Sequence, residues 1–151
     1  MKKFLISLIF IIMGMTMFAQ HMEISISDLD DKSIEFLIDN YSELMCQSPI
    51  YFVEYDDSRN GRIDEFEVHF VNGTIIEFDE NGDLKAITCG ESDVIPLFIL
   101  PYKIKNALKN YTINFDIIEY SINKHFCRKE YYIKFNNGNK IKINKNGKIK
   151  K

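Results

Sequence analysis

Residues 56–67, DDSRNGRIDEFE, have the residue types and the spacing of a calcium-binding loop. Ca²⁺ prefers oxygen ligands, and an EF-hand loop supplies them from alternate positions and from a bidentate Glu at its twelfth position, around a sharp turn at Gly61. The side chains at ligand positions are Asp56, Ser58, Asn60, Asp64 and Glu67. The alternative interpretation is a polar hairpin loop in which Asn60-Gly61 supplies the turn.

The flanking sequence favours the hairpin. An EF-hand loop lies between two helices. Here the preceding run, SPIYFVEY (48–55), is rich in aromatic and β-branched residues, and the following residues alternate between polar and apolar. Both patterns are typical of strands. We therefore expect this loop to join two strands, and we keep calcium binding as an alternative.

The sequence gives little support for a catalytic site. The histidines are His21 at the new N-terminus, His69 on the polar face of a predicted strand, and His125 in a predicted loop. No Ser lies in a nucleophile elbow, and the sequence has no glycine-rich phosphate-binding loop. We expect no enzymatic activity and no cofactor.

The first 19 residues have the features of a secretory signal peptide: Lys2 and Lys3, an apolar run, and Ala19 at the cleavage position. The apolar run is short for a bilayer span, and no lipid-attachment Cys follows it. We expect a periplasmic or secreted chain without a stable membrane anchor after cleavage. Export also argues against a nucleic-acid partner.

Charge divides the exported chain into two parts. Residues 20–95 hold 19 acidic and 4 basic residues, a net charge of −15, and residues 96–151 hold 3 acidic and 13 basic residues, a net charge of +10. Such faces could attract each other within the molecule or steer a charged partner. Pairing among Cys46, Cys89 and Cys127 stays open, because none belongs to a Cys-x-x-Cys motif.

An internal repeat organises the chain. Residues 65–85, EFEVHFVNGTIIEFDENGDLK, align without a gap on residues 130–150, EYYIKFNNGNKIKINKNGKIK, at an offset of 65. In each copy, alternating apolar residues predict strands and two Asn-Gly pairs predict tight hairpin turns, which we expect to need positive φ at both turn residues. The same offset places Glu54 and Tyr55 over Glu119 and Tyr120.

A helix precedes each set of strands in this interpretation. Residues 30–45 carry apolar side chains on one helical face behind a capping Asp, and Pro101 opens a second helix. The helices align at an offset of 67, so we place two extra residues of the first copy near 47–49. The predicted fold is α+β: two tandem repeats, residues 20–90 and 91–151, each a helix plus four antiparallel strands, with the helices on one face.

The second copy is an internal control for the calcium loop. Its corresponding stretch, SINKHFCRKEYY (121–132), lacks the acidic ligands and holds Lys124 and Arg128 instead. We therefore expect that the two copies do not bind the same ligand.

Three runs of the sequence resemble the PepSY-like, beta-lactamase-inhibitor-like envelope proteins of Bacteroidetes. They are FEVHFVNGTIIEFDENGDLKAI (66–87), VIPLFILPYKIKNALKNY (94–111) and YYIKFNNGNKIKINKNGKI (131–149). The chain departs from the family pattern in its first helix, which lacks a Leu-Pro opening, and at Asn144-Lys145, where the family turn is acidic. The resemblance implies two α+β units whose sheets form a concave, saddle-like surface. In the inhibitor after which the family is described, such a surface grips a protein partner. Fold alone does not carry function.

Exposed aromatic residues are the best candidates for partner binding, because such residues supply much of the energy of interfaces. The predicted partner-binding residues are Tyr55, Tyr120, Tyr132, Glu54 and Glu119, with Tyr51 and Phe126 as weaker members. The alternative is that the helices cover the face that holds these tyrosines. We expect an exported, non-enzymatic protein, inhibitor-like in character, that recognises an envelope protein or peptide. The alternatives are a calcium-binding envelope protein and a structural module that self-associates through its oppositely charged halves.

Overall fold

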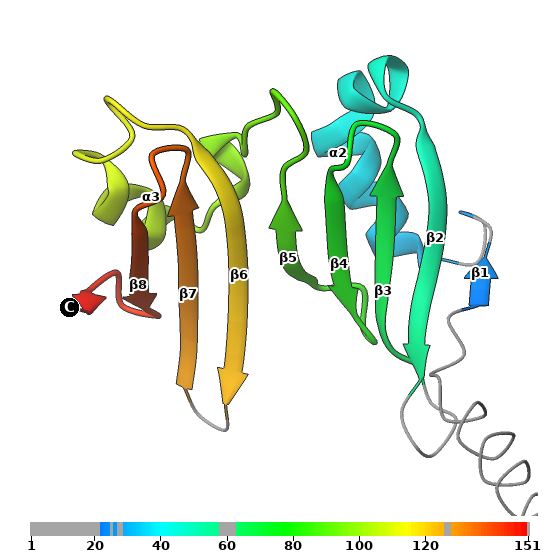
Figure 1. Cartoon of the computed structure of the whole chain (residues 1–151). Helices are drawn as coiled ribbons and strands as arrows, with labels where there is room; N and C mark the ends of the chain where they lie inside the picture. Colours follow the sequence, from blue (N-terminus) through cyan, green and yellow to red (C-terminus); the bar gives the residue numbers. More distant parts are fainter. Residues whose placement is uncertain (1–21, 25, 27–28, 58–62, 126–127, 151) are drawn as a thin grey trace, which may run out of the picture.

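A computed structural model describes residues 22–24, 26, 29–57, 63–125 and 128–150 of the chain (Figure 1). It shows one nine-stranded sheet in which the strands lie in chain order, and every neighbouring pair is antiparallel. The elements are β1 Met22–Ile24, α2 Asp31–Gln47, β2 Ile50–Asp57, β3 Ile63–Phe70, β4 Ile75–Asp79, β5 Leu84–Thr88, the 3-10 helix η2 Leu97–Ile99, α3 Tyr102–Leu108, β6 Ile117–His125, β7 Arg128–Phe135, β8 Lys140–Asn144 and β9 Ile149–Lys150. The predicted α+β class with an antiparallel sheet is confirmed.

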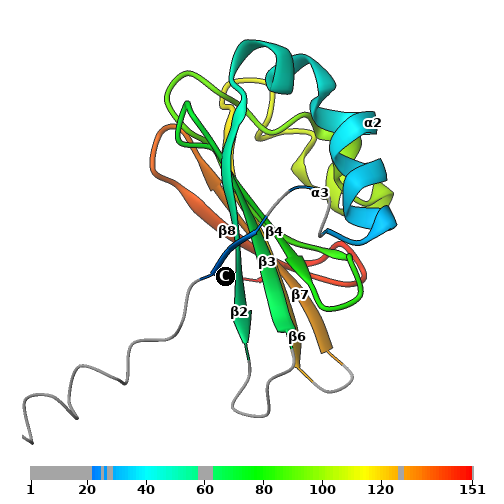
Figure 2. The same ribbon diagram turned by 90° about the vertical axis from the view of Figure 1, so that its right-hand side faces the viewer.

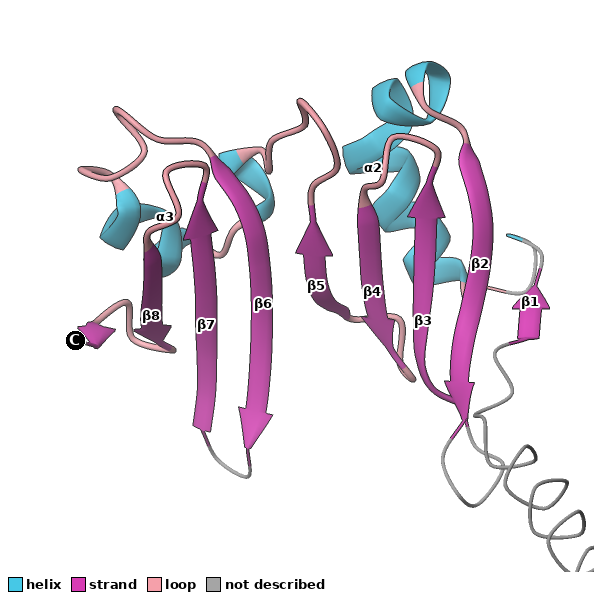
Figure 3. Ribbon diagram, in the orientation of Figure 1, coloured by secondary structure: helices cyan, strands magenta, loops and turns pink. Residues whose placement is uncertain are grey.

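Helices α2 and α3 lie on the same side of the sheet, and the other side carries no helix in the described part of the chain (Figures 2 and 3). The helices and the sheet share one apolar core. From α2 it takes Leu37 and Tyr41, and from α3 it takes Ile104 and Leu108, all buried. We call the helix-free side of the sheet the open face.

The four Asn-Gly pairs of the two repeat copies form hairpin turns, but the turn type differs from the prediction. The fifth pair, Asn60-Gly61, lies outside the described residues. Gly73 has φ +86° and donates its N–H to the carbonyl of Phe70, while Asn72 does not share the positive φ. The side chain of Asn72 instead accepts a hydrogen bond from the N–H of Thr74 at 3.0 Å. The prediction that both turn residues have positive φ is wrong. These are three-residue hairpins closed by a glycine bulge, and the glycine alone takes the left-handed conformation.

Helix α2 starts where the sequence places its cap. The carboxylate of Asp30 accepts hydrogen bonds from the N–H of Lys32 at 2.9 Å and of Ser33 at 3.0 Å. The same carboxylate lies against Gly82 in the β4–β5 turn, where a side chain would collide with it. Asp30 therefore accepts hydrogen bonds from the free N–H groups at the start of α2, and it packs this end of the helix against the β4–β5 turn.

The ladder register corrects the predicted alignment of the two halves. Val53 of β2 is opposite Val68, and Tyr120 of β6 is opposite Ile133. Val68 and Ile133 are 65 residues apart, so Tyr120 corresponds to Val53, at an offset of 67, and the predicted equivalence of Tyr55 with Tyr120 is wrong. The two-residue difference falls between the paired strands: Asp56 and its partner Glu65 are 9 residues apart, whereas the corresponding pair Asn123 and Glu130 are 7 residues apart. It does not fall near residues 47–49.

Candidate binding face of the sheet

One row of side chains crosses the open face at a single register position. Neighbouring strands place directly paired residues on the same side of a sheet. From β2 to β9 the row consists of Glu54, Glu67, Glu77, Ala86, Ser121, Tyr132, Lys142 and Lys150. The charge asymmetry of the sequence is therefore laid out across one face, with acidic residues at one end, small residues in the middle, and lysines at the other end.

The small residues in the middle of the row leave a hollow. A depression of about 780 Å³ lies over β3 to β7, with Glu65, Glu77 and Lys85 on one side and Asn123 and Tyr132 on the other. A second depression of about 420 Å³ lies over β6 to β9 and is lined by several lysines. Ser121 and Tyr132 line both. Tyr132 thus stands between an acid-rich hollow and a basic one.

Tyr132 is the predicted tyrosine that the structure places on the open face. Its side chain is 37% exposed, whereas its neighbours Tyr131 and Ile133 are buried. The ammonium of Lys142 lies 4.8 Å from the ring centroid, within the range of a cation–π contact. The hydroxyl of Tyr132 donates to Glu130 over 3.4 Å. The ring is held in place, yet part of its surface is open to a partner.

Two other predicted aromatics lie on the covered side of the sheet. Tyr120 is 1% exposed, and its ring stacks on Tyr131 at a centroid distance of 6.1 Å. Tyr55 is partly buried against the same core. The prediction that Tyr120 is an exposed anchor is wrong, and Tyr55 does not reach the open face. The reason is that both tyrosines share the side of the sheet that α2 and α3 cover.

The predicted glutamates do lie on the open face, and each contacts a basic side chain. Glu119 pairs with Lys134. Glu54 contacts the Nε2 atom of His69 at 3.0 Å. Tyr51 is 74% exposed, and Phe126 lies outside the described residues. Of the five predicted partner-binding residues, the open face therefore holds Tyr132, Glu54 and Glu119.

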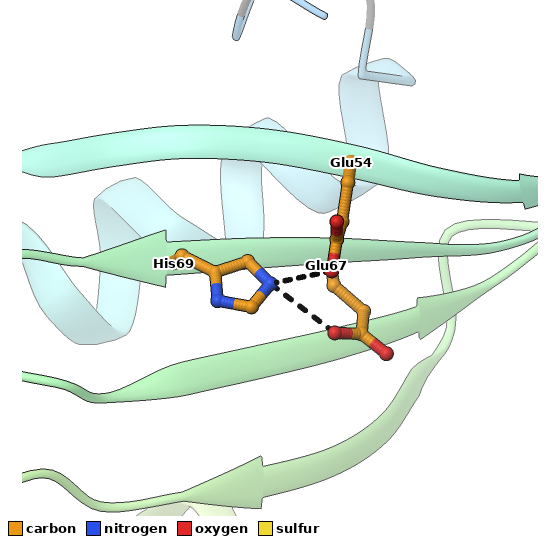
Figure 4. Close-up of side chains that lie close together, drawn as sticks. All are labelled: Glu54, Glu67 and His69. Atoms are coloured by element: carbon orange, nitrogen blue, oxygen red, sulfur yellow. Dashed lines mark hydrogen bonds and ion pairs between the residues drawn. The ribbon is translucent and has the colours of Figure 1, made fainter. Parts of the chain in front are cut away.

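A cluster of Glu54, Glu67 and His69 occupies the acidic end of the open face (Figure 4). The Nε2 atom of His69 lies 3.0 Å from Oε1 of Glu54 and 3.2 Å from Oε2 of Glu67. All three side chains are half-buried, between 17% and 29% exposed. Among the described residues, this is the group of three acidic, His or Cys side chains whose potential ligand atoms lie within 4.8 Å of one another.

The surroundings of the cluster fix its geometry. The ring of His69 stacks on Phe52 at a centroid distance of 4.1 Å and an interplanar angle of 12°. On the next strand, burial raises the pKa of Glu77, and the nearby charge of Glu67 raises it further. The cluster is therefore a sterically defined and electrostatically negative region.

Sequence reasoning placed His69 on the polar face of its strand but did not find this cluster. Half of the signal was available, because Glu67 and His69 are two residues apart and so share a face of β3. The other half required the pairing of Glu54 with Glu67 across β2 and β3. That register is a property of the folded sheet.

The calcium-loop residues are only partly described. The loop joins β2 to β3, as predicted. Ser58 and Asn60 lie outside the described residues, and Asp64 is exposed. Glu67, the predicted bidentate ligand, contacts His69.

Two of the three cysteines are free thiols, Cys46 on the surface and Cys89 partly buried. Burial raises the pKa of the Cys89 thiol to about 12. Cys127 lies outside the described residues.

An open antiparallel sheet with helices on one side, and a charged face with one central tyrosine on the other, defines an α+β protein with an accessible sheet surface. The model of one family, described as "Putative beta-lactamase-inhibitor-like, PepSY-like", matches residues 64–151. The chain belongs to this PepSY-like family, and the predicted family resemblance is confirmed.

Three solved structures of similar fold come from Bacteroides. A protein from Bacteroides vulgatus, described as a "putative periplasmic protein from DUF2874 family", has a TM-score of 0.74 at 18% identity, over 87% of this chain and 95% of its own. A protein from Bacteroides thetaiotaomicron, described as a "putative calcium-regulated periplasmic protein", has a TM-score of 0.72 at 18% identity, over 85% of this chain and 93% of its own. A second B. vulgatus protein, described as periplasmic and of unknown function, has a TM-score of 0.69 at 18% identity, over 84% and 93%. At this identity, the likeness shows a shared fold.

A comparison with curated protein sequences gave no match. Within the described part of the chain, no helix has the length and apolar character needed to cross a membrane.

Proposed function

We propose that this chain is an exported, non-enzymatic binding protein that recognises an envelope protein or peptide through the open face of its sheet. Residues 1–19 would serve as the signal peptide, and the mature chain would consist of two tandem repeats, 20–90 and 91–151. The periplasmic description of the structural neighbours supports export. The inhibitor-like description of the family supports a protein partner and names no reaction.

The observation that carries this proposal is the position of Tyr132. It is a partly exposed aromatic side chain at the centre of a helix-free sheet face, with a hollow on each side. Rigid aromatic side chains of this kind are the usual anchors of protein interfaces. Glu54 and Glu119 lie on the same face and would add charge complementarity, which acts mainly on association rate and specificity.

Affinity capture from envelope extract tests the proposal, with the wild-type chain, Tyr132→Ala and Tyr102→Ala as bait. Tyr102 is the matched control, because it is 73% exposed but belongs to α3 on the other side of the sheet. We expect a saturable partner whose affinity falls at least about tenfold with Tyr132→Ala, a loss of about 1.4 kcal/mol. Tyr102→Ala should bind as the wild type does. Equal binding by all three baits would contradict recognition through the open face.

Calcium-dependent function is the second candidate. Its support is the ligand spacing of residues 56–67 and the calcium-regulated description of the B. thetaiotaomicron neighbour. Running the same capture with Ca²⁺ and with chelator separates the two. A partner retained only with Ca²⁺, and lost on Asp56→Asn, would assign the loop a functional role.

Self-association of the oppositely charged halves is the third candidate. It predicts oligomers that dissociate as salt rises, because exposed charges are screened. Size-exclusion chromatography of the exported chain at low and high salt measures this directly.

A further inference from the structure

We propose that Glu54, Glu67 and His69 form a binding site for a divalent transition metal ion of the zinc class. The site lies on the open face, across β2 and β3, and uses one imidazole nitrogen and two carboxylate oxygens (Figure 4). It shares Glu67 with the candidate calcium loop but uses none of that loop's other ligands, and it does not depend on the proposed partner recognition.

The distances fit such an ion. Zinc binds His nitrogen and carboxylate oxygen at about 2.0–2.2 Å, so the ligand atoms of a tetrahedral site lie roughly 3.3–3.5 Å apart. The Nε2 atom of His69 already lies 3.0 Å and 3.2 Å from the two carboxylate oxygens. Small side-chain rotations would place all three atoms around one ion without movement of the strands.

The ligand types select the class of metal. Imidazole suits zinc, copper, iron and nickel, whereas calcium and magnesium take oxygen ligands almost exclusively. His69 is therefore the residue that distinguishes this site from a calcium site. Its ring is already oriented by stacking on Phe52, so little side-chain freedom would be lost on binding.

The electrostatics of the row also favour a cation at this position. Glu54, Glu67 and Glu77 stand directly opposite one another on three neighbouring strands. Like charges in direct cross-strand pairs are unfavourable. A divalent ion between Glu54 and Glu67 would relieve the repulsion between these two carboxylates. It would also weaken the field that Glu67 exerts on Glu77.

The second half of the sheet is an internal control. By ladder register, the positions of Glu54, Glu67 and His69 correspond to Ser121, Tyr132 and Lys134. A Lys ammonium replaces the imidazole, and neither carboxylate remains. The site therefore belongs to the first half alone.

Three protein ligands leave at least one coordination position for water or for a ligand from outside the chain, as in zinc sites with an open position. A His or carboxylate side chain of another molecule could complete the shell at this position.

Isothermal titration calorimetry of the exported, chelator-treated chain with zinc chloride tests the proposal. The variants are Glu67→Gln and His69→Gln. The matched controls are Glu65→Gln, which removes the same charge from the same strand at a residue paired with Lys85, and Lys134→Gln at the position that corresponds to His69. Melting curves without metal confirm that each variant folds.

We expect saturable binding of one ion per chain, with affinity reduced at least about tenfold by Glu67→Gln and His69→Gln and unchanged by both controls. Cobalt bound to the wild type should give the visible absorption bands of a tetrahedral site. These bands should be lost in His69→Gln. Absence of zinc binding up to about 1 mM would overturn the proposal. An equal loss in Glu65→Gln would overturn it as well, because binding would then follow surface charge. If His69→Gln fails to fold, Glu67→Gln against Glu65→Gln and the wild-type cobalt spectrum decide.

Discussion

The half of the sheet formed by β2–β5 and the half formed by β6–β9 share one ladder register and differ in what their open face carries. The pairs of β3 with β4 recur in β7 with β8 at an offset of 65. In the first half the shared positions hold Glu67 and Glu77; in the second they hold Tyr132 and Lys142. Buried apolar residues and glycine turns set the register, so the open face is free to diverge in charge and chemistry.

The helices differ as well. Helix α2 has 17 residues and a side-chain cap from Asp30, whereas α3 has 7 residues and follows Pro101 without a side-chain cap. Both nevertheless fill the same place in the core, since Leu37 and Tyr41 of α2 align with Ile104 and Leu108 of α3. What the halves share is the buried contact, which a short helix can supply as well as a long one.

The largest expected effect distinguishes Tyr120 from Tyr132 in the second half of the sheet. Tyr120→Ala should lower the free energy of unfolding by about 3–5 kcal/mol, because it leaves a large cavity in the core. Tyr132→Ala should change it by about 0.5 kcal/mol or less, because the residue is partly exposed. Urea unfolding of both variants measures the difference. Equal losses would mean that the assignment of core and open face is incorrect.

A smaller effect is expected at a buried hydroxyl of the first half. Tyr41 is 4% exposed, and within the described structure its hydroxyl has no hydrogen-bond partner. Burial raises the pKa of this phenol, and the charge of a nearby Cys89 thiolate raises it further. The second half has Leu108 at the corresponding position. Tyr41→Phe should therefore raise the free energy of unfolding by about 1 kcal/mol, since it removes an unsatisfied buried group.

Thermal melting tests this change, with Tyr111→Phe as the control because Tyr111 is 40% exposed. A loss of stability in Tyr41→Phe would show that the hydroxyl is satisfied, for example by a buried water molecule.

The smallest effects concern pH and have opposite signs in the two halves. Hydrogen bonds from Lys142 and Lys150 lower the pKa of Glu130 from 4.5 to about 2. Its stabilising contribution is therefore present above pH 4.5 and is lost as the pH falls toward about 2. Burial raises the pKa of Glu77, so its ionised form destabilises the fold at neutral pH, and protonation removes that penalty.

Melting temperatures of Glu130→Gln and Glu77→Gln between pH 2 and 7, in the presence of chelator, measure both. Glu130→Gln should lower the melting temperature at neutral pH and flatten the decline below pH 4.5. Glu77→Gln should raise the melting temperature at neutral pH. The same sign for both variants would contradict the contrast between the acidic and the basic end of the open face.

The sequence by itself determined the local structure. Alternation of apolar residues defined β3, β4, β7 and β8, and the Asn-Gly pairs located their turns, because strand periodicity and glycine conformation are properties of short segments. The N-cap of α2 was visible for the same reason. The sequence did not indicate β1 or the end of α3 at Leu108. Short edge strands and helix ends depend on tertiary contacts.

The tertiary structure alone decided which side of the sheet is covered and which residues meet across strands. In β6 a register irregularity between Ile117 and Glu119 lets Ile117 and Tyr120, three residues apart, both point into the core. Simple alternation would have separated them. The same dependence on register brings Glu54 to His69, which are 15 residues apart in sequence. Faces and cross-strand clusters arise from pairing between distant segments, and a pattern read along the chain does not contain that pairing.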